Sequence, residues 1–69
     1  MSLTEIGINI HDRRIFLNLK QEDLAEIAGV AIKTIYAIES GKANPSVKTL
    51  MKLLNVLGME IITQIKKSK

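Results

Sequence analysis

The segment from Gln21 to Gly41 constrains the fold of this chain more than any other part of the sequence. It contains two short stretches with helical periodicity, which Gly29 separates. A glycine at such a junction can take the left-handed backbone conformation that a sharp turn between two helices requires. The small Ala25 precedes this glycine by one helical turn and leaves room for the second helix to cross the first closely. The segment therefore predicts a helix-turn-helix corner.

A corner of this kind holds its second helix where it can enter the major groove of DNA. The charge balance is compatible with that partner, with 10 Lys and Arg against 7 Asp and Glu, a formal net charge of +3 and a pI of about 9.5. The balance is weak support, because many small soluble domains are equally basic.

The 69 residues provide one domain, 1–69, with the corner over about 21–40. A chain this short buries only about 60% of its unfolded surface, so its stability needs further support. There is no cysteine for a disulfide or a thiolate metal site, and a single His11 cannot build a zinc site. We therefore expect no metal and no cofactor. Oligomerisation remains as the source of additional stability, and a hydrophobic fraction of 46% is compatible with a core shared between subunits.

Three broad classes of protein are disfavoured by what the sequence lacks. No apolar run approaches the ~20 residues of a membrane span, and no signal peptide is recognisable. We therefore expect a cytoplasmic protein. The sequence contains no convergent acid–base pair, no nucleophile beside a base and no glycine-rich phosphate loop. An enzyme is not expected.

The first helix is predicted from Thr4, as its cap, to Leu17. It should end at Asn18, because asparagine tolerates the left-handed conformation that terminates many helices. The apolar spacing of this helix defines one face, with an arginine alongside. The residues of that face are Ile6, Ile10, Arg14 and Leu17.

The second helix is predicted to begin at Gln21, and the third to run from about Ile32 to Ser40. Gly41 should stop the third helix. The residues of these two helices that should face the core are Leu24, Ala25, Ala28, Ile35 and Ile38.

A loop over 42–45 follows, because its proline keeps the preceding residue out of helical conformation. Ser46 is the natural cap of a fourth helix, and Gly58 should close it. The apolar stripe of this helix has the spacing i, i+3, i+4 and i+7. It consists of Leu50, Leu53, Leu54 and Leu57.

After Gly58 the sequence alternates with a period of two, which predicts a strand over about 59–66. One strand alone is unstable, and the chain offers no second, so we expect pairing with the same strand of another copy. A helical extension of the fourth helix is the alternative. The residues expected at the dimer interface are Met59, Ile61, Ile62, Thr63 and Ile65.

A set of residues between Gln21 and Leu50 stands at spacings that resemble those of the Xre/Cro-type helix-turn-helix family. The resemblance covers roughly 6–57. The matching residues are Gln21, Leu24, Ala25, Gly29, Val30, Ile35, Ile38, Glu39, Gly41, Pro45, Ser46 and Leu50. The resemblance implies an all-α, four-helix, lambda repressor-like domain that binds double-stranded DNA. A fourth helix followed by a short strand further resembles the HipB-like antitoxins, which implies a HipA-like kinase toxin as a partner.

The resemblance also implies roles for single residues. The base-reading positions are Ala31, Ile32, Lys33, Tyr36 and Ala37. The set predicted to contact phosphates consists of Lys20, Gln21, Thr34, Lys42 and Asn44. A salt bridge between the first and third helices is implied for Arg14 and Glu39.

The sequence departs from the family pattern at two of these positions. Lys20 stands where the family commonly has a Ser or Thr cap, and Ala31 where it often has Ser. The start of the third helix therefore offers few hydrogen-bonding groups to bases. We expect phosphate contacts and DNA shape to supply much of the affinity.

Five apolar residues should lie off the core faces: Ile8, Ile15, Phe16, Ile27 and Ile32. Ile8 and Ile15 are two turns apart on the first helix and could form a strip for a dimer or a protein partner, unless longer-range packing covers them. The interpretation that the sequence favours is a homodimeric repressor, which occupies a near-palindromic operator with half-sites about 34 Å apart. The alternative is a protein-interaction module that has kept the same fold without specific DNA binding.

Overall fold

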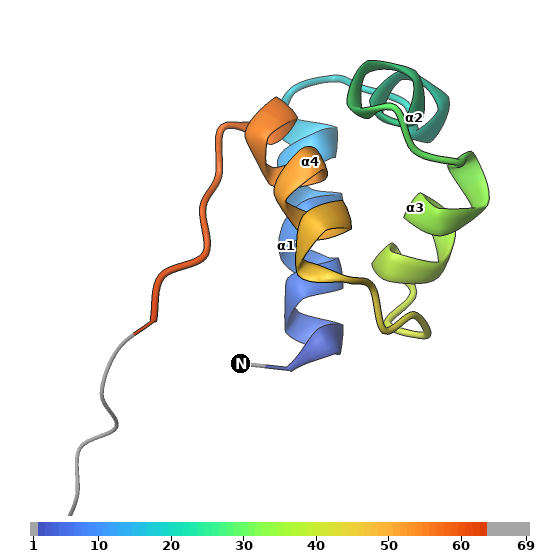
Figure 1. Ribbon diagram of the computed structural model, residues 1–69. Coiled ribbons are helices and arrows are strands. Elements are labelled where there is room, and N and C mark those ends of the chain that lie inside the picture. The colour runs from blue at the N-terminus through green and yellow to red at the C-terminus, as the bar shows by residue number, and fades with distance from the viewer. Residues whose placement is uncertain (1, 64–69) are drawn as a thin grey trace, which may run out of the picture.

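The computed structural model describes residues 2–63, and this part of the chain contains four helices (Figure 1). They are α1 (Leu3–Phe16), α2 (Gln21–Ala28), α3 (Ile32–Glu39) and α4 (Val47–Leu57). α1 packs against α3 and α4, and α2 also packs against both of these helices. The all-α, four-helix architecture agrees with the prediction. None of the helices in residues 2–63 is long and apolar enough to cross a membrane.

One apolar core lies between the helices, and every helix contributes to it. Its buried residues are Ile10, Leu24, Ala25, Ile35, Ile38, Leu50, Leu53, Leu54 and Leu57. The predicted stripe of α4 is buried in full. Three predicted core residues differ: Ile6 and Ala28 are only partly buried, and Leu17 is 37% exposed. Leu17 lies beyond the last residue of α1, so the helical period no longer directs it inwards.

α1 begins one residue earlier than predicted, and its cap is Ser2 instead of Thr4. The Ser2 hydroxyl accepts a hydrogen bond from the Glu5 backbone N–H at 3.1 Å, which satisfies one of the free donors of the first turn. The other end of α1 is Phe16, one residue before the predicted Leu17, and Asn18 has the predicted left-handed backbone, with φ of 63°.

The corner between α2 and α3 has the predicted geometry at Gly29. The φ of this residue is 72°, and a Cβ atom placed on it would meet no atom within 4 Å. Backbone conformation, and not crowding, therefore selects glycine here. The Val30 N–H donates to the Ala25 carbonyl at 3.0 Å and closes the end of α2.

α2 begins without a Ser or Thr cap, as the departure at Lys20 implies. Instead, a side chain inside α2 stabilises its start. The Asp23 carboxylate accepts a hydrogen bond from the Lys20 backbone N–H at 2.8 Å. This is one half of a capping box, and it was not predicted from the sequence. The cap of α4 is as predicted, with the Ser46 hydroxyl accepting from the Thr49 N–H at 3.1 Å.

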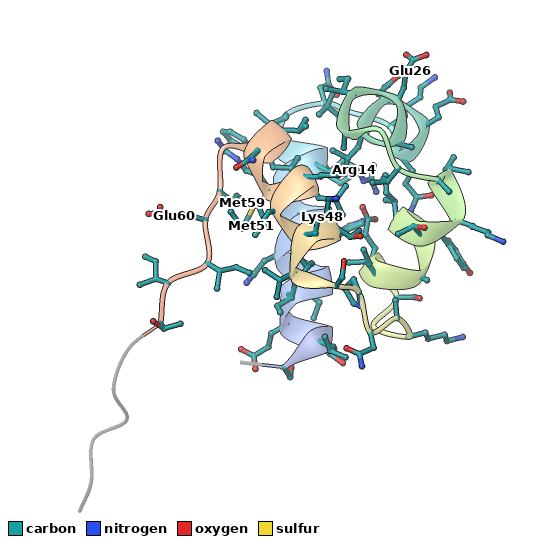
Figure 2. The ribbon with its side chains drawn as sticks, viewed as in Figure 1. Arg14, Glu26, Lys48, Met51, Met59 and Glu60 are labelled. Carbon is teal, nitrogen blue, oxygen red and sulfur yellow. The ribbon has the colours of Figure 1, made fainter. Side chains whose placement is uncertain are left out.

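The predicted strand is absent from residues 59–63, which follow α4 without regular secondary structure (Figure 1). A strand needs a hydrogen-bonding partner, and the single chain supplies none in its described part. Met59 packs against the chain's own core, whereas Glu60 points away from the helices (Figure 2). The remaining predicted strand residues, 64–66, lie outside the described residues, and so does Ile65 of the expected interface.

Candidate nucleic-acid interface

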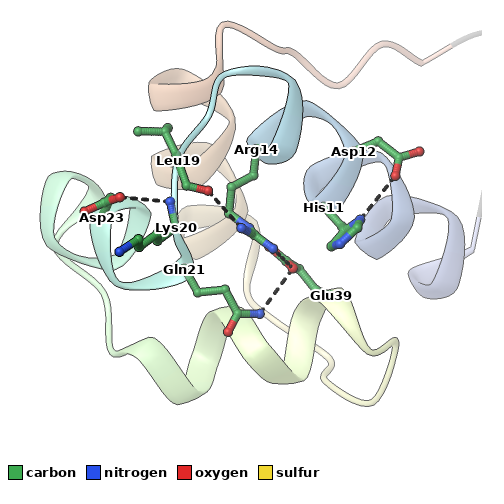
Figure 3. A network of polar contacts seen from close by, with 8 residues as sticks. All are labelled: His11, Asp12, Arg14, Leu19, Lys20, Gln21, Asp23 and Glu39. Carbon is green, nitrogen blue, oxygen red and sulfur yellow. Dashed lines mark hydrogen bonds and ion pairs between the residues drawn. The ribbon is translucent and has the colours of Figure 1, made fainter.

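A buried ion pair joins α1 to the last residue of α3 (Figure 3). The Arg14 Nε donates to Glu39 Oε2 at 2.6 Å, and Arg14 Nη2 donates to Glu39 Oε1 at 2.9 Å. The side chains retain only 8% and 5% of their exposed area. This bidentate geometry fixes both the spacing and the rotation of α3 relative to α1.

Two further hydrogen bonds extend this ion pair towards α2 (Figure 3). Arg14 Nη1 donates to the Leu19 carbonyl at 2.8 Å, and the Gln21 side-chain amide donates to Glu39 Oε1 at 3.2 Å. Hydrogen bonding to Glu39 raises the pKa of Arg14, and this effect outweighs burial, which lowers it. Arg14 is therefore a permanent cation that links α1 to the segment before α2 and to the end of α3.

A groove lies between α3 and the segment that connects it to α4. α3 contributes one charged, one hydroxyl and one small side chain, the connecting loop contributes three residues, and the first turn of α4 contributes one. The lining residues are Lys33, Thr34, Ala37, Ala43, Asn44, Pro45 and Thr49. No acidic side chain lines this groove.

The structure places all five predicted base-reading residues on α3 or at its cap. Ala31 precedes the helix, and Ile32 and Lys33 occupy its first turn. Tyr36 is 64% exposed, while Ala37 is partly buried in the groove.

The predicted phosphate-contacting residues lie in two places. Lys20 and Gln21 stand at the start of α2, and Gln21 uses its amide N–H on Glu39. Thr34 and Asn44 line the groove, while Lys42 is exposed beside it in the loop after α3. Four of the predicted DNA contacts thus line one groove, and the others are not part of its lining. The four are Lys33, Thr34, Ala37 and Asn44.

Besides Asp23, two residues with defined contacts were not predicted from the sequence. Thr49 lines the groove and accepts a hydrogen bond from the Ser46 hydroxyl at 3.1 Å. Arg13 donates to the Leu57 carbonyl at 2.9 Å and lies 5.2 Å from the centre of the Phe16 ring. A lone threonine or arginine within a helix carries no periodic signal, so only the packing of the helices shows these contacts.

The expected apolar residues outside the core are exposed. They are Ile8, Ile15, Phe16, Ile27 and Ile32. Longer-range packing within residues 2–63 does not cover Ile8 or Ile15, each of which keeps about half of its exposed area (49% and 54%).

The corner of α2 and α3 defines this chain as a helix-turn-helix protein, and comparison with known proteins supplies the family. The helix-turn-helix family profile matches residues 10–63. An uncharacterized HTH-type transcriptional regulator of Methanocaldococcus jannaschii is 48% identical over 48 residues, covering 70% of this chain and 73% of the relative. Another, from Methanothermobacter thermautotrophicus, is 41% identical over 56 residues, covering 81% of each.

A solved structure agrees with these relatives. The crystal structure of the restriction-modification controller protein C.AhdI from Aeromonas hydrophila has a TM-score of 0.79 and 29% identity, covering 84% of this chain and 88% of that one. The chain belongs to the Xre/Cro-type helix-turn-helix family of DNA-binding transcriptional regulators, with the lambda repressor-like fold, and this is not a family of enzymes.

Proposed function

We propose that this regulator is a cytoplasmic, homodimeric repressor that occupies a near-palindromic operator. The observation that carries the proposal is the buried Arg14–Glu39 pair, which holds α3 rigidly with its exposed face beside a groove free of acidic side chains. A recognition helix must keep one orientation to read base edges, and this network supplies that orientation. C.AhdI, a controller protein of similar fold, is consistent with a regulatory role.

The proposed contacts are those that the family resemblance implies for single residues. Lys33 reaches guanine O6 and N7, and Ala31 and Ile32 contact thymine methyl groups. Tyr36 and Ala37 complete the base-facing surface of α3. Lys20, Gln21, Thr34, Lys42 and Asn44 contact phosphates, and these contacts supply most of the affinity.

A symmetric dimer would place two copies of α3 in successive major grooves, about 34 Å apart. Pairing of the segments that begin at Met59 would build the two-fold interface through Ile61, Ile62, Thr63 and Ile65. Ile61 and Ile62 are exposed in the single chain, so an interface that covers them would remove apolar surface from water.

A second candidate function rests on the exposed Ile8 and Ile15 of α1. These side chains offer an apolar surface to a protein partner. An antitoxin that also represses its own operon would use that surface to bind a HipA-like kinase toxin. A pure interaction module would use it without specific DNA binding.

Selection of binding sites from a randomised duplex pool separates a DNA-binding repressor from a pure interaction module. With the full chain at moderate salt, we expect a palindromic motif whose half-sites lie about one helical turn apart. No enrichment, from protein that is folded and dimeric, would contradict the repressor and favour the interaction module.

Replacing Lys42 by Ala should weaken binding to all duplexes alike. A lysine that neutralises one phosphate releases counterions, so the slope of log K against log salt should become shallower by about 0.9 for each copy of the site. Fluorescence anisotropy over a salt series measures this slope on the selected duplex and on an unrelated one. The control is Lys52→Ala, on the exposed surface of α4 and outside the proposed contacts, which should leave the slope closer to the parent value. An unchanged slope for Lys42→Ala would remove this residue from the phosphate set.

Replacing Ile62 by Asp should convert the dimer to monomers at micromolar concentration, because it buries a charge at the centre of the proposed interface. Ile62 is 70% exposed in the single chain, so the helical fold should be retained. Val47→Asp is the matched control, since Val47 is 69% exposed but lies on α4. Sedimentation equilibrium distinguishes the two states. A dimer that survives Ile62→Asp would contradict pairing through this segment.

A further inference from the structure

The end of α4 is held by a side chain from α1. Arg13 Nε donates a hydrogen bond to the carbonyl of Leu57, the last residue of α4, at 2.9 Å. Carbonyl groups in the last turn of a helix lack partners within the helix, and the helix dipole favours a positive charge at that end. Within residues 2–63 Arg13 pairs with no carboxylate, so its guanidinium is committed to this helix end.

The turn that follows α4 is closed at the same place. Gly58 has a left-handed backbone with φ of 69°, and the Met59 N–H donates to the Leu54 carbonyl at 2.8 Å. A Cβ atom placed on Gly58 would lie 3.6 Å from Arg13 Nη2, so the guanidinium lies against this turn. One bond from the backbone and one from Arg13 therefore fix where the chain leaves the helix.

Arg13 is itself held by Phe16, one turn along α1. The Arg13 Cζ lies 5.2 Å from the centre of the Phe16 ring, which is within the range of a cation–π contact. Phe16 is 76% exposed, so its ring is not part of the core. The contact limits the rotamers open to the arginine side chain and keeps Nε directed at the end of α4.

The direction of the chain after Gly58 decides where the segment 59–63 lies. The chain turns back at the end of α4, and Met59 and Ile61 line a hollow together with Ile10 of α1 and Leu54 of α4 (Figure 1). This segment has no regular secondary structure in the single chain, so its position relative to the helices depends on how it leaves α4.

We infer that Arg13 is a positioning residue for dimerisation. By fixing the exit of the chain from α4, it sets the angle between the segment 59–63 and the helices, and thereby the distance between the two copies of α3. This inference rests on the proposed homodimer that pairs through the same segment. Both protomers carry any rotation of the segment, so the two-fold axis doubles its effect. A shift of about 3.4 Å corresponds to one base pair of half-site spacing.

Hydrogen exchange in the full chain, followed by NMR, tests the local part of the inference. Arg13→Met removes the donor and the charge but keeps an unbranched stem of good helix propensity. We expect the Met59 amide to exchange about tenfold faster, as for the loss of a hydrogen bond from a charged group. The Thr49 amide, which Ser46 caps at the other end of α4, should be unchanged. Equal exchange of Met59 in variant and parent would overturn the inference.

Operator spacing tests the consequence for the dimer. The duplexes carry the selected half-sites at the selected spacing, or with one base pair added or removed. The parent should bind the selected spacing best, and Arg13→Met should lose this preference while it still recognises the half-sites. A loss of packing alone would lower the unfolding temperature without changing the ratio of these affinities. Arg13→Lys, which keeps a cation that can donate to the Leu57 carbonyl, should restore the preference.

Lys52→Met is the matched control, because it removes one positive charge from the exposed surface of α4. It should affect every spacing alike and leave the exchange of Met59 unchanged. If Arg13→Met failed to fold, Phe16→Leu at its exposed position would replace it. This variant weakens the hold on the guanidinium, so it should speed the exchange of Met59 by roughly two- to fivefold and reduce the spacing preference.

The outcomes for the proposed function and for this inference are distinct. A parent protein that is monomeric or binds no duplex would overturn the proposed function and the spacing role of Arg13 with it. Faster exchange of Met59 in Arg13→Met would still show in that case that Arg13 fixes the end of α4. A parent that binds a palindromic site, with Arg13→Met equally selective for its spacing, would overturn only the role of Arg13.

Discussion

Replacing Glu39 by Leu is expected to lower the free energy of unfolding by about 3–5 kcal/mol, because it leaves the buried Arg14 cation without its carboxylate. The Leu19 carbonyl would remain as its only described acceptor. For a domain of this size each 1 kcal/mol corresponds to about 4–8 °C in Tm, so the variant should melt more than 10 °C earlier. Urea unfolding followed by circular dichroism measures the change.

A double variant separates the charge from the packing. Arg14→Leu together with Glu39→Leu removes both charges and should recover much of the lost stability, since an apolar pair of similar volume often matches a buried ion pair. Glu22→Leu, at an exposed position on α2, is the control and should change little. A Glu39→Leu variant as stable as the parent would show that the ion pair does not hold α1 to α3.

The effect of this pair should not depend on pH near neutrality. Pairing raises the pKa of Arg14 in the folded protein, so its contribution is fully present below the ordinary pKa of arginine and is lost only as the pH rises above it. The loss measured for Glu39→Leu should therefore be the same at pH 6 and at pH 8.

The second large effect is expected from Gly7→Ala. Helix propensity alone favours alanine by about 1 kcal/mol in the interior of a helix. The structure reverses the sign of the expected change in stability, because the added Cβ would collide with the backbone carbonyl oxygen of Ile38 on α3. A backbone atom cannot rotate away, so α1 must move off α3, and overpacking of this kind typically costs 1–3 kcal/mol or more.

Chemical denaturation and DNA affinity should change together in Gly7→Ala, because displacing α1 also strains the Arg14–Glu39 pair that orients α3. The matched control is Asn9→Ala, at an exposed position on the same helix, which should be neutral or slightly stabilising. A Gly7→Ala variant more stable than the parent would contradict the close approach of α1 and α3.

Much of the fold was predictable because it depends on near neighbours in the chain. The left-handed residues Asn18 and Gly29 stand where local chemistry favours that conformation. The strand expected after Gly58 does not form in residues 59–63 of the single chain, since alternation predicts a strand only where a pairing partner exists.

The candidate site was less predictable. Residue types at family positions pointed to Lys33 and Asn44, which line one groove. The bond from Gln21 to Glu39, and the place of Thr49 beside Asn44, carry no signal in sequence spacing. These contacts depend on how separate elements meet.

By itself, the sequence determined the helices, the corner and the apolar faces, because periodicity and turn chemistry act over a few residues. Tertiary structure alone decided the contacts between distant segments. The backbone of α3 approaches Gly7 closely, and Arg13 binds the end of α4 at Leu57. Such contacts depend on the distance and angle at which packed helices cross, and these are set by the whole core at once.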